Sequence, residues 1–256
     1  MKIAVCVKQI PDPSAPGRLD PATSRLVRQG VDLVLDPGDA YGVEAALQLA
    51  RGDGDEVVAV GMGPEGAAEA LRKAMAMGVG AALLVSDPRL GGADALATAR
   101  VLARAVARLA PDLLIAGTES TDGYTGIVPA AVAEFLGWPS LTFARQLELA
   151  GPGLRIQRQT PQGHDLVESA LPAVVTVTGG INEPRYPTLK GIVAARGREI
   201  DQPTLEDLGL DPAQLAPGQR VASVEPVPAR EAGELVEDDG SGAKRIADLL
   251  AELKVI

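Results

Sequence analysis

The sequence predicts an α/β fold: a mostly parallel β-sheet with helices on both faces, an antiparallel extension of that sheet, and an extended C-terminal arm. In the first half of the chain, short β-branched runs alternate with helical patterns, which is typical of a parallel sheet covered by helices. Beyond Trp138 the strand-like runs are shorter and follow one another without helices. From Ile200 onward the chain is rich in proline with little apolar periodicity, and such a segment cannot build its own core.

The first half predicts strands and helices in alternation. Asp36 followed by Pro37 is typical of an N-cap and a first helical position, and Gly78 is typical of a helix end. The apolar residues of 93–109 fall mostly on one helical face, which predicts an amphipathic helix. We therefore expect strands at 2–7, 56–60, 81–85 and 112–116, and helices at 37–51, 64–77, 93–109 and 128–136.

The second half predicts the antiparallel extension and the arm. Alternating runs predict short strands at 141–149, 154–160, 164–169 and 173–178. The segment from 200 to about 237 needs another surface to lie on, and 243–253 predicts a short amphipathic helix. We expect two parts: an α/β domain at 1–199, and an arm with a helix at 200–256 that either embraces a partner subunit or packs on its own chain.

Composition excludes several function classes. The chain has 34 acidic and 24 basic residues, and its net charge of −10 repels nucleic acid and anionic membrane surfaces. With Cys6 and His164 as the sole cysteine and histidine, a disulfide, a Cys-rich zinc site and a Ser–His–Asp triad are excluded within one chain. The N-terminus lacks a signal-peptide pattern, and no apolar run is long enough to span a membrane. We expect a cytoplasmic protein without metal, catalytic residues or membrane insertion.

The segment 61–66 (GMGPEG) matches the dinucleotide fingerprint GxGxxG, since it follows a predicted strand and opens a predicted helix. Two residues argue against that interpretation. Pro64 lacks a backbone donor for a pyrophosphate, and Glu65 places a carboxylate where it would repel phosphate. An NAD-dependent oxidoreductase that uses Gly61, Gly63 and Gly66 remains an alternative beside an ordinary helix start.

The stretch after the strand 112–116 is a better candidate for binding phosphate. Gly117 allows close backbone approach, and Gly123 and Gly126 allow the positive φ angles that aim successive N–H groups at an anion. No lysine follows these glycines, so the loop can bind a monophosphate but cannot support phosphoryl transfer. The alternative is a plain turn in which Asp122 caps the next helix.

Two further strand ends carry candidate residues. In the segment 36–39 (DPGD), the carboxylates could accept hydrogen bonds from a ribose or an adenine amino group, or merely cap the helix. Cys6, at the end of the first strand, is expected to pack as a small hydrophobe.

Six segments carry a likeness that runs over nearly the whole chain. They are IAVCVKQIPDP, LDPGDAYGVEAALQL, VVAVGMGPEGAAEALRKAMAMG, TESTDGYTGIVPAAVAEFLGWP, LPAVVTVTGGINEPRYPTLKGI and AGELVEDDGSGAKRIADLLAELKVI. Together they resemble the β subunits of electron transfer flavoproteins, bacterial members in particular. The resemblance implies a Rossmann-like domain of the adenine nucleotide hydrolase-like type at 1–199, with the arm at 200–256 around an α subunit.

The resemblance also implies cofactors. The α subunit of the heterodimer would hold most of the FAD, and this chain would bury a structural AMP. By matching position, the AMP contacts would come from Cys6, Asp36, Pro37, Gly38, Asp39, Met62, Asp122, Gly123, Tyr124, Thr125, Gly126, Ile127, Val128, Pro129, Ala130 and Ala133. Electron transfer would then be the role of the heterodimer, and this chain would not itself be an enzyme.

The segment 181–191 (INEPRYPTLKG) resembles the family's recognition loop for partner dehydrogenases. The resemblance implies docking by Leu189, assisted by Glu183, Arg185 and Tyr186. It implies flavin-containing dehydrogenases, such as acyl-CoA dehydrogenases, as donors and a membrane quinone oxidoreductase as acceptor. From the residues alone, Leu189 and Ile192 could instead staple a helix at 188–196.

The sequence departs from the family pattern in places. Members that bifurcate electrons bind a second FAD at the AMP position and often carry an acidic residue and a glutamine in the glycine loop (residues 123–127). This chain lacks both residues in that loop, so AMP is favoured. The opening CVKQIPDP and the segment 86–94 (SDPRLGGAD) resemble some of those members, so a second FAD remains an alternative. Gln159 stands where a carboxylate commonly orients the flavin domain of the other subunit.

Overall fold

The computed structural model describes residues 1–219, 221–225, 227–228, 233, 235 and 239–256, and its chain divides into two compact units. The first unit is Met1–Val221 and the second is Ala222–Ile256. No helix in the described residues combines the length and the apolar character needed to cross a membrane.

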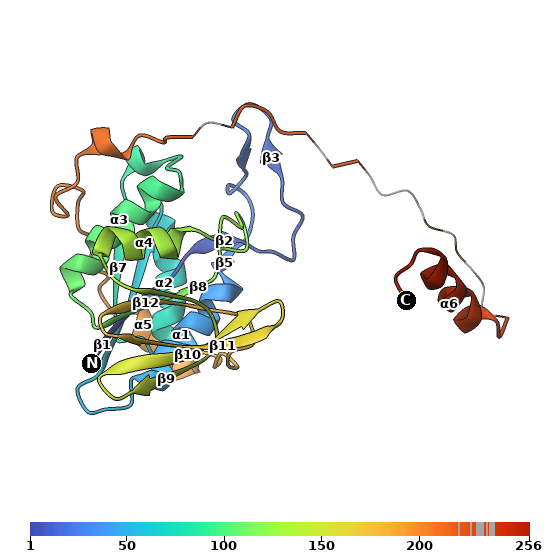
Figure 1. Ribbon diagram of the computed structural model, residues 1–256. Coiled ribbons are helices and arrows are strands. Elements are labelled where there is room, and N and C mark those ends of the chain that lie inside the picture. Colours follow the sequence, from blue (N-terminus) through green and yellow to red (C-terminus); the bar gives the residue numbers. More distant parts are fainter. Residues whose placement is uncertain (220, 226, 229–232, 234, 236–238) are drawn as a thin grey trace. The chain divides into compact units, whose positions relative to one another are not determined.

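The first unit contains an eight-stranded sheet in the order β11-β10-β9-β12-β8-β1-β6-β7 (Figure 1). Six neighbouring strands are parallel, and they are β9 (Ser140–Ala150), β12 (Ala173–Val177), β8 (Leu113–Gly117), β1 (Lys2–Cys6), β6 (Glu56–Met62) and β7 (Ala81–Val85). The strands β10 (Gly153–Thr160) and β11 (Gly163–Ala170) are antiparallel. The predicted α/β class with an antiparallel extension is confirmed.

One predicted strand lies elsewhere. The segment 173–178 was expected in the antiparallel extension, but β12 is a parallel strand between β8 and β9. All five of its residues are buried, as in a strand that is covered on both faces. Its apolar run therefore belongs to the parallel type.

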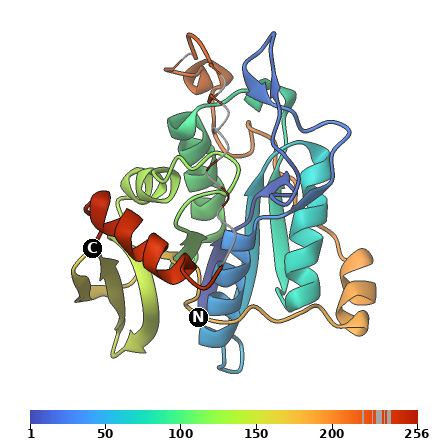
Figure 2. The same cartoon turned by 90° about the vertical axis from the view of Figure 1, so that its right-hand side faces the viewer.

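Helices cover both faces of the sheet (Figure 2). One face packs against α1 (Pro37–Leu49) and α2 (Ala68–Met77), with α5 (Leu189–Arg196) beside α2. The other face packs against α3 (Ala95–Leu109) and α4 (Val128–Leu136). Neighbouring residues of β1 serve opposite cores, since Ile3 and Val5 belong to the first and Ala4 to the second.

Local signals set the helix ends. Asp36, Asp94 and Thr188 each cap the helix that follows, with a side-chain oxygen that accepts a backbone N–H. Gly78 ends α2 with φ +129°, a conformation that favours glycine. Between Gly63 and α2 lies a 3₁₀ turn, η1 (Glu65–Ala67), and similar turns are η2 (Pro88–Leu90) and η3 (Pro212–Leu215).

The segment between β1 and α1 forms two small sheets that the sequence does not reveal. The strands β2 (Gln9–Pro11) and β5 (Leu33–Leu35) pair antiparallel, as do β3 (Leu19–Asp20) and β4 (Arg25–Leu26). The sequence does not predict these strands, because they are only two or three residues long and the segment contains several prolines. The β2–β5 pair brings the end of β1 back to the start of α1.

The residues after 199 begin by lying on the first unit. Asp201 pairs with Leu83 of β7, with its N–H donated to the carbonyl of Ala82 at 2.9 Å. The side chains of Leu205, Leu208, Leu210 and Leu215 are buried in the second core. Residues 200–215 thus pack on their own chain, within the first compact unit.

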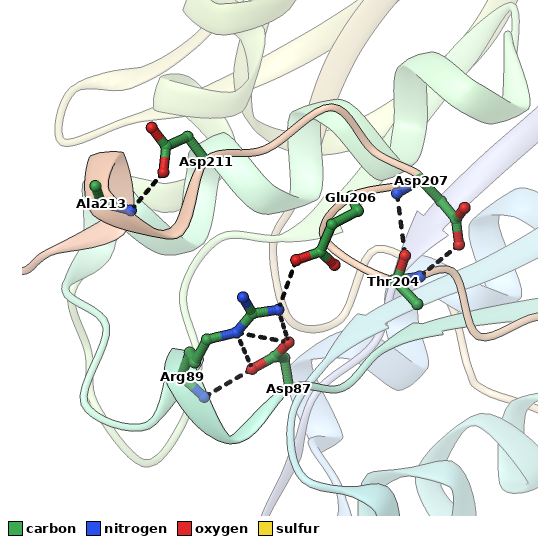
Figure 3. A network of polar contacts seen from close by, with 7 residues as sticks. All are labelled: Asp87, Arg89, Thr204, Glu206, Asp207, Asp211 and Ala213. Atoms are coloured by element: carbon green, nitrogen blue, oxygen red, sulfur yellow. Dashed lines mark hydrogen bonds and ion pairs between the residues drawn. The ribbon is translucent and has the colours of Figure 1, made fainter.

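Polar contacts add to this packing (Figure 3). Arg89 forms ion pairs with Asp87 at 2.6 Å and with Glu206 at 3.0 Å, while Thr204 and Asp207 bond each other. Further along, the N–H of Gly218 bonds the Asp94 carboxylate at 2.7 Å. Residues 220, 226, 229–232, 234 and 236–238 of the predicted arm lie outside the described residues.

The second unit contains α6 (Gly242–Glu252), close to its predicted bounds. Ile246, Leu249, Leu253 and Val255 are all exposed. The described residues of the second unit therefore do not cover the apolar face that the sequence predicts for this helix.

If the packing of residues 200–215 stabilises the first unit, Leu205→Ala should lower its free energy of unfolding by about 2–5 kcal/mol, because Leu205 is fully buried and truncation leaves a cavity. Leu166→Ala, at a leucine that is 67% exposed on β11, should change it by less than about 0.5 kcal/mol. Chemical denaturation of both variants tests this. Equal effects would show that the segment does not contribute to the core.

Candidate functional site

The sheet has a switch point between β1 and β8, its adjacent central strands. From β1 the chain continues into α1 on one face, and from β8 into α4 on the other. A crevice at the carboxyl ends of two such strands is where open α/β sheets bind ligands. The predicted segments 36–39 and 117–128 both meet there.

Asp36 joins the start of α1 to the loop after β8. Its carboxylate is fully buried and accepts the N–H of Gly38 at 2.8 Å, which caps α1. It also accepts the N–H and the hydroxyl of Thr121, both at 2.7 Å. The predicted cap is confirmed, and the same carboxylate fixes the glycine loop.

Asp39 is a second buried acid, one helical turn further. One of its oxygens accepts the N–H of Lys8 at 2.7 Å, and a Cβ on Gly117 would lie 3.0 Å from the other. Gly117 therefore allows the approach predicted for it, although toward Asp39. Burial and the charge of Asp36 raise the pKa of the Asp39 carboxyl to about 8, so it is largely protonated at neutral pH.

Asp122 anchors the loop through two cations. Its carboxylate is 2% exposed and forms ion pairs with the Lys8 ammonium at 2.7 Å and with Arg28. Burial opposes ionisation, but these two hydrogen-bonded cations outweigh it and hold the pKa of Asp122 below its ordinary value. The Lys8 ammonium also donates to the Ser120 hydroxyl at 3.1 Å. Two cations thus meet one carboxylate at this edge of the crevice, while the carboxylates of Asp36 and Glu119 also lie at the loop.

The alternative interpretation of Asp122 as a helix cap is wrong. The helix α4 begins at Val128, the cap position is Ile127, and no side chain caps this end. The first N–H groups of α4 are therefore available to an anion.

The glycine loop differs from expectation in its strained positions. Positive φ angles occur at Tyr124 (+47°) and Gly126 (+69°), while Gly123 does not adopt one. Gly123 was expected to need that region; a Cβ there would make only ordinary contacts, at 3.6 and 3.7 Å. Residues 123–127 are all exposed.

The remaining predicted contact residues are less accessible. Cys6 and Met62 pack against the second core at the ends of adjacent strands, and burial with the charge of Asp39 raises the pKa of the Cys6 thiol to about 12. Pro129 and Ala133 are buried on α4, whereas Ala130 is exposed. Cys6 packs as a small hydrophobe, as expected, and does not resemble a reactive thiol.

The fingerprint glycines serve packing. Gly61 lies within β6, where a Cβ would come 3.0 Å from the carbonyl oxygen of Val7. A Cβ on Gly63 would lie 2.9 Å from the Cβ atom of Ala67. The chain then enters η1, and α2 begins only at Ala68. These close approaches explain Gly61 and Gly63 without a pyrophosphate, whereas no atom lies within 4 Å of a Cβ on Gly66.

Lys8 and Arg28 are site residues that sequence reasoning missed. Lys8 follows directly after a strand that points at the switch point, which is a signal that could have marked it. Arg28 lies 94 positions before Asp122, and nothing local in its sequence indicates the contact.

The predicted docking residues lie on a separate surface. Tyr186 is 91% exposed and Leu189, the first residue of α5, is 78% exposed, so Leu189 does not staple the helix. Glu183 is exposed as well, whereas the guanidinium of Arg185 bonds the buried carboxylate of Glu44. No cluster of three or more His, Cys, Asp or Glu side chains that could hold a metal occurs in the described part of the chain.

Comparison with known proteins agrees with this fold. Residues 23–208 match the family model of the electron transfer flavoprotein domain. The chain is 40% identical to the electron transfer flavoprotein subunit beta of Mycobacterium bovis, with 99% of each chain covered. It is 35% identical to that of Megasphaera elsdenii over the full length of both.

A relative with another printed name is similar over the same extent. The caffeyl-CoA reductase-Etf complex subunit CarD of Acetobacterium woodii is 35% identical, with 99% of this chain and 98% of that protein covered. Matches of this extent, together with the parallel sheet and its glycine loop, show that the chain belongs to the family of electron transfer flavoprotein β subunits, which are electron transfer proteins.

Proposed function

We propose that this chain binds a structural AMP at the switch point of its sheet and acts, with an α subunit, as a carrier that passes electrons through FAD. The observation that carries the proposal is the exposed glycine loop, held at its base by Asp36 and Asp122 and followed by an uncapped helix. Such a loop can grip a phosphate through backbone N–H groups.

The chemistry of the crevice fits a monophosphate nucleotide. Phosphate would meet the loop 123–127 and the first turn of α4, where Val128 and Ala130 lie, with Lys8 and Arg28 nearby to balance its charge. Asp36 to Asp39 and the strand ends at Cys6 and Met62 would border the adenosine. Catalysis by this chain is not part of the proposal. The raised pKa of Cys6 disfavours a thiolate nucleophile, and the Thr121 hydroxyl that bonds Asp36 is used to hold the loop in place.

The heterodimer supplies the redox group. FAD would be held mainly by the α subunit, and the exposed apolar face of α6 would pack against that subunit. Residues beyond 221 are then the partner-embracing part of the arm, while 200–215 stay on their own chain. The proposed setting is the cytoplasm.

Docking of donor dehydrogenases would use Leu189, Tyr186 and Glu183. Two exposed apolar side chains beside a carboxylate are suited to a transient contact, as a flavin dehydrogenase such as an acyl-CoA dehydrogenase would make. A membrane quinone oxidoreductase is the proposed acceptor.

Release of the bound nucleotide tests the proposal. Heat denaturation of the purified chain, followed by chromatography of the supernatant, should yield AMP in about equal amount to protein. NAD would favour an oxidoreductase that uses residues 61–66. Two FAD per purified heterodimer without AMP would favour the electron-bifurcating alternative.

Strain at the glycine loop predicts a nucleotide-binding defect. Gly126→Ala should cost about 1–2 kcal/mol in backbone strain at φ +69° and reduce AMP retention, because the loop must distort. Gly137→Ala is a matched control at φ +67°, at the opposite end of α4, with no atom near the added Cβ. Both variants should lose similar stability, and only Gly126→Ala should lose nucleotide. Full AMP occupancy in Gly126→Ala would place the phosphate elsewhere.

Docking predicts a separate effect at α5. Leu189→Ala should raise the KM for a partner acyl-CoA dehydrogenase roughly 10- to 100-fold, since burying a leucine contributes about 1.5–3 kcal/mol. Flavin content of the heterodimer should not change. Leu96→Ala removes another exposed leucine, at the start of α3, and should leave the KM unaltered. Equal KM values for wild type and Leu189→Ala, measured by stopped-flow flavin reduction, would contradict the assignment.

A further inference from the structure

We propose that Arg185 is a positioning residue, which holds the docking segment (residues 183–189) on α1 through Glu44 and does not itself contact the partner. This inference rests on the proposed docking function. It differs from the direct contact that the family resemblance implies for Arg185, and it adds Glu44 as the second half of the device.

The pair has the geometry of a two-pronged ion pair. Nε of Arg185 donates to Oε2 of Glu44 at 2.7 Å, and Nη2 donates to Oε1 at 3.0 Å. The backbone N–H of Arg185 adds a third bond to Oε2 at 3.2 Å. A fork of this kind fixes orientation as well as distance, which a lysine could not do.

The acceptor, Glu44, lies on the buried face of α1. Glu44 is 4% exposed, and its Oε1 also accepts the side-chain amide of Gln48 at 2.9 Å. A buried carboxylate is costly unless its oxygens are paired, so these donors explain why Glu44 occupies this position. Two nitrogens of the Arg185 guanidinium are engaged by Glu44, although the Arg185 side chain as a whole is 46% exposed.

Other contacts pin the chain on both sides of the exposed side chains. Asn182 donates to the carbonyl of Tyr41 on α1 at 3.0 Å. On the other side, Gly191 approaches α2 so closely that a Cβ would lie 2.4 Å from the carbonyl oxygen of Ala76. Between these points Tyr186 and Leu189 protrude. The segment is thus held by contacts on both sides, and the side chains that it presents are exposed.

Such a frame removes a cost of binding. A partner that docks on a loose segment must order its backbone, and this ordering entropy weakens the complex. Breaking the Arg185–Glu44 pair should loosen residues 183–189 and raise the KM for the dehydrogenase roughly tenfold, with kcat unchanged.

The experiment compares Arg185→Gln, Arg185→Lys and Glu44→Gln in the complete heterodimer. Arg196→Gln, which removes a charge from the end of α5, is the control. Two readouts are needed: amide hydrogen exchange of 183–189 without partner, and the KM of an acyl-CoA dehydrogenase at several salt concentrations. The three pair variants should exchange faster and raise the KM, while the salt dependence stays that of the wild type.

Several results would overturn the proposal. Unchanged hydrogen exchange together with a raised KM and a weaker salt dependence would show direct contact of Arg185 with the partner. An unchanged KM in spite of faster exchange would show that the pair serves stability alone. The docking function itself is judged by Leu189→Ala: if that variant docks normally, the docking surface is wrong, whatever the exchange rates at Arg185.

Discussion

Asp36 carries a buried carboxylate that serves two elements at once, since it caps α1 and accepts two hydrogen bonds from Thr121. If the glycine loop left the switch point, the buried Asp36 carboxylate would lose both Thr121 bonds, and burial makes that loss expensive. Lys8 also joins two elements, because its backbone N–H donates to Asp39 while its ammonium donates to Asp122. The crevice is thus defined by three acids from two loops, held together around the end of β1.

Two cations lie near the proposed phosphate position, although the chain as a whole is acidic. A net charge of −10 is spread over the surface and screened within about 8 Å at physiological ionic strength. Lys8 and Arg28, in contrast, meet within one hydrogen-bond length of a single buried carboxylate. Local placement of charge, and not the total, decides what this edge can bind.

Much of the fold can be predicted from the sequence, because the residues that start and end its helices act locally. Helix starts are marked by Asp36 with Pro37 and by Thr188, and the side chains of Asp36 and Thr188 accept backbone N–H groups. A helix end is marked by Gly78, which adopts a positive φ angle. The place of β12 is not readable, since strand order depends on pairing between distant segments. Contacts between distant segments also explain why only part of the site can be predicted from the sequence. The glycine loop is visible in the sequence, whereas the positive φ at Tyr124 and the contact of Arg28 arise only from the assembled fold.

The pairing of Asp201 with β7 has a consequence for the behaviour of the molecule in a crowded solution. An uncovered strand at the margin of a sheet can recruit a strand from another molecule and begin an aggregate. Asp201 occupies part of that margin at β7. At the opposite margin, β11 carries the exposed Asp165, whose charge disfavours a second copy brought alongside, and Glu168, which is paired with Arg155 at 2.6 Å. The two margins are protected by different means, one by occupancy and one by charge.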